Sequence, residues 1–283
     1  MLAIITDSTS DLRADELAAL KVRRVPLYVN FQGKVHRDWL DIDPAKIVAG
    51  VQAGADLPTT SQPSPEDFTQ AYAAAVAEGA TEILVVTITS GMSGTFQSAN
   101  LAAKDATVPV SIVDSQNASA GIAILVRQAV RMRDAGAARD AIVATLESMR
   151  AQMIVLFSVG TLEYLQKGGR IGRAQALLGG LLNVRPILSL EDGKIVPAGK
   201  ARGTKKAIAE IVERIREHAA KHSGELVLDF LHIQDKPAAE SLRQAVRDAG
   251  ITFIDGSVYE IGAVIAAHVG PGTFGVYAHI KPA

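Results

Sequence analysis

The amino-acid sequence predicts a two-domain α/β protein. The N-terminal domain is expected to hold a parallel sheet with flanking helices, and the C-terminal domain a mixed sheet backed by helices. Three observations favour this class. The chain of 283 residues is long enough for two domains. Its first half repeats a strand–turn–helix pattern, and its second half adds a hairpin signal to further strand–helix pairs.

The first half contains short apolar segments at residues 2–6, 82–89 and 110–115, each followed by a polar turn and a helical period. Strands alternating with helices in this way indicate βαβ units and therefore a parallel sheet. Residues 21–39 are expected to add one strand and a hairpin-like excursion.

The second half opens with an apolar strand at residues 153–159, and residues 160–190 fit a helix, a glycine-rich turn, a second helix and a strand. Asp192-Gly193 has the composition of a tight hairpin turn. The remaining elements are helices at 204–222 and 238–249, strands at 225–233, 252–258 and 274–280, and a short helix within 262–270. We place the domains at 1–155 and 156–283. We expect a cleft between them, because no long linker separates them.

Composition excludes several classes of function. The chain is 48% hydrophobic and 21% charged, has a net charge of −1 and contains no cysteine. Without cysteine it has no disulfides and no thiolate metal sites. Its net charge is too small to attract nucleic acid or an anionic membrane over a distance. It has neither a signal-peptide pattern nor an apolar run of roughly 18 residues, so we expect a soluble cytoplasmic protein without a transmembrane segment.

Hydroxyl side chains gather in PTTSQPSPEDF, residues 58–68, just before a predicted helix. Ser64 is suited to cap this helix and Pro65 to occupy its first position. The three hydroxyls at residues 59–61 are not explained by the helix, so they are candidates for ligand binding.

Ser93 lies between two glycines in ITSGMSGTFQSA, residues 88–99, where the backbone could approach a ligand closely. Capping of the following helix is the simpler interpretation. The spacing does not match the G-x-S-x-G nucleophile elbow.

His268 ends a short apolar helix just before Gly270-Pro271-Gly272. A helix C-terminus favours a protonated imidazole, which would suit a carboxylate or phosphate. A core histidine bonded to a carbonyl is the alternative.

Basic side chains surround three glycines in KGGRIGRAQ, where Lys167, Arg170 and Arg173 form either an anion or partner-protein site or a set of solvated charges. Arg202 lies near the start of another predicted helix.

Two further patterns receive structural interpretations. His218 and His222 have metal-ligand spacing but lack H-E-x-x-H, so we predict a solvated helix face and no metal site. Asp7 and Asp114 at strand ends are expected to act as caps.

Six segments together resemble the DegV family over nearly the whole chain. They are IITDSTSDL, TTSQPSPEDF, ITSGMSGTFQSA, VDSQNASAG, the stretch from Gly160 to Leu188, and HVGPGTFGV. The resemblance implies two α/β domains that bind a long-chain fatty acid between them, such as palmitate, stearate or oleate. It also implies a non-catalytic subunit of bacterial fatty acid kinase. A separate ATP-binding subunit would phosphorylate the carboxylate for phospholipid synthesis, and no cofactor is implied.

The same resemblance implies which residues hold the carboxylate. The carboxylate-binding positions of the family correspond to Thr60, Ser93 and His268 in this sequence, and Arg202 corresponds to an arginine near the head group. Some members carry another basic residue where this chain has Gly203-Thr204, which is a departure from the pattern. From its position next to Thr60, we add Ser61.

The energetics of a bound acid suit this arrangement. Burying a tail of about 14 methylenes, at about 0.8 kcal/mol each, contributes roughly 11 kcal/mol of favourable binding free energy. The entropy lost when the tail is ordered and the ligand is immobilised offsets part of this free energy. A buried carboxylate must be hydrogen-bonded, and neutral hydroxyls accomplish this without a permanent charge. The segments 122–126, 176–188 and 263–269 are candidate walls for the tail, although core packing is their default role.

Two other functions compete with this one. Ser93 or Asp7 at the strand ends could serve a stand-alone hydrolase or phosphotransferase, although no triad order supports it. A lipid-sensing regulator is a third option, but the sequence shows no DNA-binding module.

Overall fold

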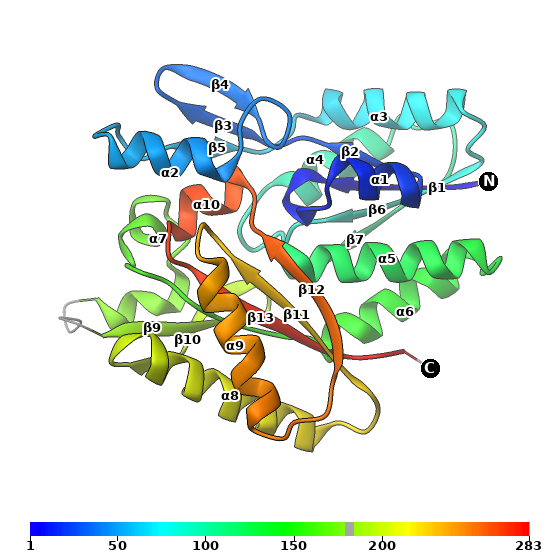
Figure 1. Cartoon of the computed structure of the whole chain (residues 1–283). Coiled ribbons are helices and arrows are strands. Elements are labelled where there is room, and N and C mark those ends of the chain that lie inside the picture. The colour runs from blue at the N-terminus through cyan, green and yellow to red at the C-terminus, as the bar shows by residue number, and fades with distance from the viewer. Residues whose placement is uncertain (179–183, 283) are drawn as a thin grey trace. The chain divides into compact units, whose positions relative to one another are not determined.

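The structure, a computed structural model, describes residues 1–178 and 184–282. It comprises two compact units, each with its own sheet (Figure 1). The first unit contains Met1–Asp43, Pro58–Ala151 and Gly262–Val264, and the second contains Pro44–Leu57, Gln152–Ile261 and Ile265–Ala283. The two units are therefore interleaved along the sequence.

The first unit contains the predicted parallel sheet, in the order β2-β1-β6-β7. Its strands are β1 (Leu2–Asp7), β2 (Val22–Val25), β6 (Glu82–Thr87) and β7 (Val110–Asp114). All three neighbouring pairs are parallel, as the strand–helix alternation predicts. The middle of β6 is fully buried, which is expected of a strand covered on both faces.

Helices cover both faces of this sheet (Figure 1). They are α1 (Ala14–Leu20), α3 (Pro65–Ala77), α4 (Thr95–Ala103), α5 (Ala120–Asp134) and α6 (Arg139–Ala151). Phe68 and Tyr72 of α3 and Ala99 of α4 join the strand residues in one apolar cluster. Residues 122–126 of α5, a candidate lipid wall, are almost completely buried.

A small antiparallel sheet in the order β4-β3-β5 also belongs to the first unit. Its strands are β3 (Tyr28–Phe31), β4 (Lys34–Arg37) and β5 (Thr59–Ser61). The hairpin of β3 and β4 is confirmed, but β5 is an element that the sequence did not predict. Its register pairs Thr60 with Val29 and Ser61 with Tyr28. The hydroxyl segment thus forms a strand through its backbone, and its side chains alternate between the two faces of the small sheet.

The second unit contains a mixed sheet in the order β10-β9-β8-β13-β11-β12. Its strands are β8 (Ile154–Ser158), β9 (Arg185–Glu191), β10 (Lys194–Ala201), β11 (Leu226–His232), β12 (Ile254–Glu260) and β13 (Phe274–Ile280). The predicted hairpin turn is confirmed: Asp192 and Gly193 have φ of 49° and 71°, the two left-handed positions of a type I′ turn.

The helices of the second unit are α2 (Pro44–Gln52), α7 (Glu163–Lys167), α8 (Gly203–Lys221), α9 (Lys236–Asp248) and most of α10 (Ala263–Val269). Two short 3₁₀ turns complete the fold, η1 (Ser8–Ser10) in the first unit and η2 (Gly172–Leu177) in the second. The predicted second helix after the glycine-rich turn is only η2, and residues 179–183 of that segment, part of a candidate lipid wall, lie outside the described residues. Helices α8 and α9 pack on the mixed sheet (Figure 1).

The predicted solvated face of α8 is wrong at His218. This side chain is only 9% exposed, and burial lowers its pKa to about 4. Its imidazole bonds to the backbone of Gln152 and lies against the ring of His222, with 4.6 Å between ring centroids. His218 is therefore a neutral core residue of an amphipathic helix.

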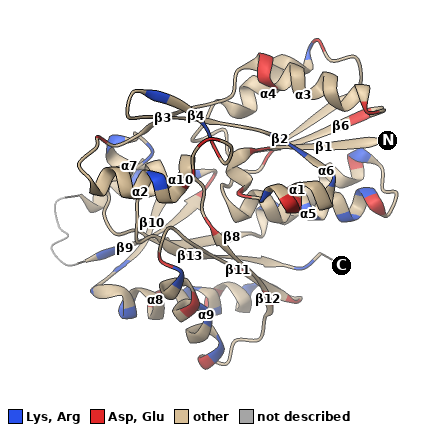
Figure 2. Ribbon diagram, turned by 45° about the horizontal axis from the view of Figure 1, so that its top comes forward, with Lys and Arg blue, Asp and Glu red and all other residues tan. Residues whose placement is uncertain are grey.

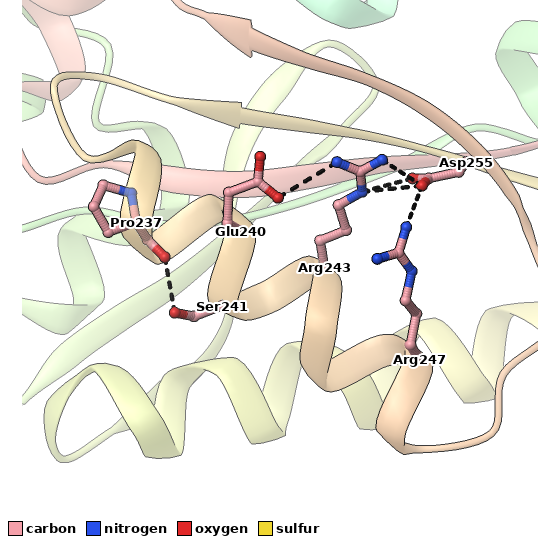
Figure 3. Close-up of polar contacts among 6 residues, drawn as sticks. All are labelled: Pro237, Glu240, Ser241, Arg243, Arg247 and Asp255. Atoms are coloured by element: carbon pink, nitrogen blue, oxygen red, sulfur yellow. Dashed lines mark hydrogen bonds and ion pairs between the residues drawn. The ribbon is translucent and has the colours of Figure 1, made fainter.

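Ion pairs join α9 to β12 on the surface of the second unit (Figure 3). Asp255 receives hydrogen bonds from Arg243 and Arg247, and Arg243 also pairs with Glu240. Two cations and two anions balance one another here, so the cluster attaches the strand to the helix rather than attracting an ion.

None of the helices in the described ranges combines the length and hydrophobicity that a bilayer crossing requires.

Candidate ligand-binding site

Asp7 at the carboxyl end of β1 organises the loops around it. Its carboxylate accepts hydrogen bonds from the amides of Thr9 at 2.9 Å and Ile88 at 2.7 Å. Burial raises the pKa of Asp7 to about 6, although these hydrogen bonds act in the opposite direction. Because Asp7 accepts bonds from both loops, it caps η1, as predicted, and also fastens the loop that follows β6.

Asp114 at the end of β7 holds the same loop from its other side. It accepts hydrogen bonds from the amides of Ser90 at 3.2 Å and Gln116 at 2.9 Å. The turn that carries Ser93 is therefore held by carboxylates at the ends of β1 and β7, the two strands that flank β6.

Ser93 lies one residue before Gly94, the N-cap of α4. Its hydroxyl accepts a hydrogen bond from the amide of Thr95, the first helical residue, at 3.4 Å and pairs with the Thr95 hydroxyl at 2.8 Å. The simpler interpretation, that Ser93 caps this helix, is therefore confirmed in part: its hydroxyl bonds a helical amide, although Ser93 is not the N-cap residue. Ser93 is only partly buried, so its hydroxyl keeps the capacity for a further bond.

Gln62 connects β5 to this turn. A Cβ placed on Gly94 would lie 2.1 Å from the amide oxygen of Gln62, so any larger residue there would displace the Gln62 amide. The same amide donates to the hydroxyl of Ser98 at 3.2 Å. The structure thus brings the residue after Ser61 against the residue after Ser93.

Sequence reasoning missed Gln62. The available signals were its position directly after the hydroxyl segment and the glycine directly after Ser93. Within the same unit Thr60 is half-buried and Ser61 is exposed.

His268 lies in the glycine-rich segment of the second unit. A Cβ on Gly168 would lie 2.2 Å from Nδ1 of His268, so this glycine makes room for the imidazole. Burial, and after it the charge of Arg170, lower the pKa of His268 to about 4. Of the two interpretations of His268, the low pKa favours the core histidine over the cationic one, because the imidazole is then neutral at pH 7.

Arg170 is the basic residue that approaches His268, whereas its neighbours form ion pairs elsewhere. Arg170 donates to the carbonyl of Gly168 at 2.7 Å. Lys167 pairs with Glu163 at 2.8 Å, and Arg173 pairs with Glu191. Two of the three predicted anion-binding side chains thus have acidic partners, and Figure 2 shows acidic residues interspersed with basic ones along the elements.

Arg202 is the exposed N-cap residue of α8 and makes no side-chain capping bond. The more constrained cation nearby is Arg185, which sequence reasoning missed. It donates to Ser158 at 3.3 Å and to the carbonyl of Gly272 at 2.5 Å. Arg185 therefore holds the Gly-Pro-Gly turn that follows α10.

The described parts of the chain, residues 1–178 and 184–282, contain no group of three or more His, Cys, Asp or Glu side chains able to hold a metal. The hydroxyl, amide, imidazole and guanidinium groups described above can bind an oxyanion by hydrogen bonding.

Comparison with known proteins decides the family. A family model described as "Uncharacterised protein, DegV family" matches residues 1–281. The chain belongs to the DegV family. A DegV domain-containing protein of Deinococcus radiodurans is 42% identical over 275 residues, covering 97% of each chain. A protein of Thermotoga maritima named a fatty acid-binding protein is 33% identical, with 96% and 95% coverage.

Solved DegV structures agree with the fold. One described as fatty acid binding of a DegV family protein from Thermus thermophilus is 46% identical, covers 99% of both chains and has a TM-score of 0.95. A stearic acid-binding protein from Eubacterium ventriosum is 27% identical, also covers 99% of both chains and has a TM-score of 0.90. The two-unit DegV fold predicted from the sequence motifs is thereby confirmed.

Proposed function

We propose that this chain binds a long-chain fatty acid and presents its carboxylate to a separate ATP-dependent kinase subunit, which forms the acyl phosphate. One observation carries the proposal: the 46% identical structure from Thermus thermophilus, matched over 99% of the chain, is described as fatty acid binding. The chain itself then acts as a carrier and performs no chemistry, and it acts in the cytoplasm.

Five residues are assigned to the carboxylate. Thr60, Ser61 and Ser93 come from the first unit, and His268 and Arg202 from the second. Neutral donors suit this task because they hydrogen-bond a carboxylate in either ionisation state. The low pKa of His268 supports a neutral donor rather than a counter-charge.

The basic loop is assigned to the partner. Lys167, Arg170 and Arg173 lie in or beside η2 and α7, and two of them make exposed ion pairs that are weak in water. The basic side chains of such pairs can exchange their acidic partners for acidic groups on a kinase surface at little cost in free energy.

Lipid extraction tests the proposal directly. Protein purified from a bacterial host is extracted with organic solvent, the extract is analysed by mass spectrometry, and stripped protein is titrated with oleate. We expect recovered acyl chains and saturable binding. Repeated absence of both would refute the proposal.

Ser93→Ala and Thr60→Ala should each weaken oleate binding by about tenfold, the value of one lost hydrogen bond to a charged group. Ser241→Ala and Thr145→Ala are matched controls, because both hydroxyls donate to carbonyls of their own exposed helices (Figure 3 for Ser241). Equal affinity in all four variants would contradict the assignment of the head group. Turnover of acyl phosphate by the chain alone, lost in Ser93→Ala, would favour a stand-alone enzyme instead.

A further inference from the structure

Two buried carboxylates of the first unit hold the start of α10. Asp11 accepts a hydrogen bond from the amide of Gly262 at 2.9 Å. Asp38 accepts from the amides of Ala263 at 3.1 Å and Val264 at 3.4 Å. We call Asp11 and Asp38 the acid pair. The acid pair accepts hydrogen bonds from the amides at the beginning of α10, the helix that contains His268.

The acid pair is built into a crowded site. Asp11 and Trp39 both adopt left-handed backbone conformations, with φ of 56° and 62°, which non-glycine residues rarely do. The indole of Trp39 donates to Asp11 at 3.1 Å. A Cβ on Gly262 would lie within 2.6 Å of both side chains, so no other residue fits there.

The two carboxylates are not equivalent. Both oxygens of Asp11 accept bonds, Oδ1 from Trp39 and Gly262 and Oδ2 from Ser119 at 2.5 Å. By contrast, Oδ2 of Asp38 is buried and has no hydrogen-bond partner among the residues that the structure describes. A buried anionic oxygen without a donor is costly, so the geometry favours a charge on Asp11 and a proton on Asp38.

The groups that face the acid pair are few. Arg13 interacts with Asp11 and lies 3.8 Å from the centre of the Trp39 ring. Arg24 of β2 interacts with both acids, and its own pKa is lowered by burial. Ser8, Ser119 and Trp39 contribute neutral donors. The negative charge of Asp11 also acts on Asp38.

We propose that Asp38 carries a proton beside the charged Asp11, and that in this state the acid pair positions α10, and with it His268, for the lipid head group. The inference rests on the proposed function for its effect on lipid. When the proton of Asp38 leaves for solvent, two buried negative charges repel one another. Relief requires water entry or separation of the carboxylates, and either one loosens the amides of residues 262–264. Lipid affinity then falls.

The direction of the pKa shifts agrees with this geometry. Burial, and after it the charge of Asp11, raise the pKa of Asp38 to about 8. Burial also raises the pKa of Asp11, to about 7, against its hydrogen bonds from Ser119 and Trp39. Asp38 therefore loses its proton above neutral pH.

The only tryptophan of the chain lies in this site, so its fluorescence reports on the pair directly. Lipid-free wild type, Asp38→Asn and the exposed control Asp105→Asn are titrated from about pH 5 to about pH 9. Asparagine mimics a protonated Asp38 but cannot ionise. We expect a transition at about pH 7 to 8 in wild type and in the control. We expect Asp38→Asn to lose the part of the transition near pH 8 that belongs to Asp38 and to keep at most the part near pH 7 that belongs to Asp11.

Oleate affinity is measured on the same three proteins at about pH 6 and about pH 9. We expect a drop of about tenfold in wild type and in the control, and less than about threefold in Asp38→Asn. The ligand is identical throughout and His268 stays neutral over this range, so neither accounts for a difference between variants. An equal drop in wild type and Asp38→Asn would overturn the inference.

The outcomes separate this inference from the proposed function. If wild type binds no acid but the fluorescence transition depends on Asp38, the proposed function fails and the acid pair stands. If wild type shows no transition, the acid pair is wrong whatever the lipid result. If Asp38→Asn does not fold, carbon-13 NMR of wild-type aspartate carboxyl groups decides. Resonances that titrate at about pH 7 to 8 support the pair, and titration of all of them below about pH 6.5 overturns it.

Discussion

At some positions of this fold, neighbouring side chains leave no room for a residue larger than glycine. Gly262 has ordinary backbone angles, but its Cα faces the indole of Trp39 and a carboxylate oxygen of Asp11. Such a glycine is required by space rather than by backbone freedom, a distinction that the sequence alone does not reveal.

Gly262→Ala should therefore lower the free energy of unfolding by about 1–3 kcal/mol, the usual cost of overpacking a filled site. Urea unfolding followed by Trp39 fluorescence measures it. The folded-state emission should change as well, because the indole must move away from Asp11. A variant with the wild-type midpoint and spectrum would show that the space is larger than described.

At the scale of one element, α3 shows a helix start that the sequence specifies fully. Ser64 accepts from the amide of Asp67 at 3.2 Å, and Asp67 accepts in return from the amide of Ser64 at 2.7 Å. Pro65 occupies the first position, as predicted. This capping box fixes α3 three residues after β5, which carries the proposed head-group residues Thr60 and Ser61.

Ser64→Ala should cost about 1 kcal/mol of stability. Because an aspartate caps equally well, Ser64→Asp should restore most of that loss. Chemical denaturation of both variants checks the prediction. Similar losses in the two variants would mean that the serine is needed for something other than capping.

Helix ends, the hairpin turn at Asp192 and the parallel strands could be predicted because each depends on neighbours in the sequence. The role of β5 could not, since a three-residue strand is defined by its partner β3. The sequence also could not decide between a cationic and a core His268. The choice depends on burial of the imidazole beside Gly168, about 100 residues earlier in the chain.

For the whole molecule, opposing titrations shape the dependence of stability on pH. Asp7, Asp11 and Asp38 have folded-state pKa values raised to about 6, 7 and 8, so the stability they contribute is lost as the pH rises from about 4 through these values. His218 and His268 have pKa values lowered to about 4, so the stability they contribute is present above about 6.5 and lost as the pH falls through 4.

The two ranges overlap below about pH 6.5, but above it the histidines are neutral in both states and only the buried acids act. We therefore expect the urea midpoint to decline from about pH 6.5 to about pH 9. Asp38→Asn should flatten the alkaline side of this profile. A wild-type midpoint that rises steadily to pH 9 would contradict the raised pKa values of the buried acids.

The interleaving of the units has a consequence for synthesis on the ribosome. The first unit includes Gly262–Val264, which lie close to the C-terminus. The amides of these residues donate hydrogen bonds to Asp11 and Asp38. Until residues 262–264 are translated, a nascent chain that has completed the parallel sheet lacks one of the donors to Asp11 and the two backbone donors to Asp38. Truncation before residue 262 should therefore yield an immature first unit rather than an independent domain.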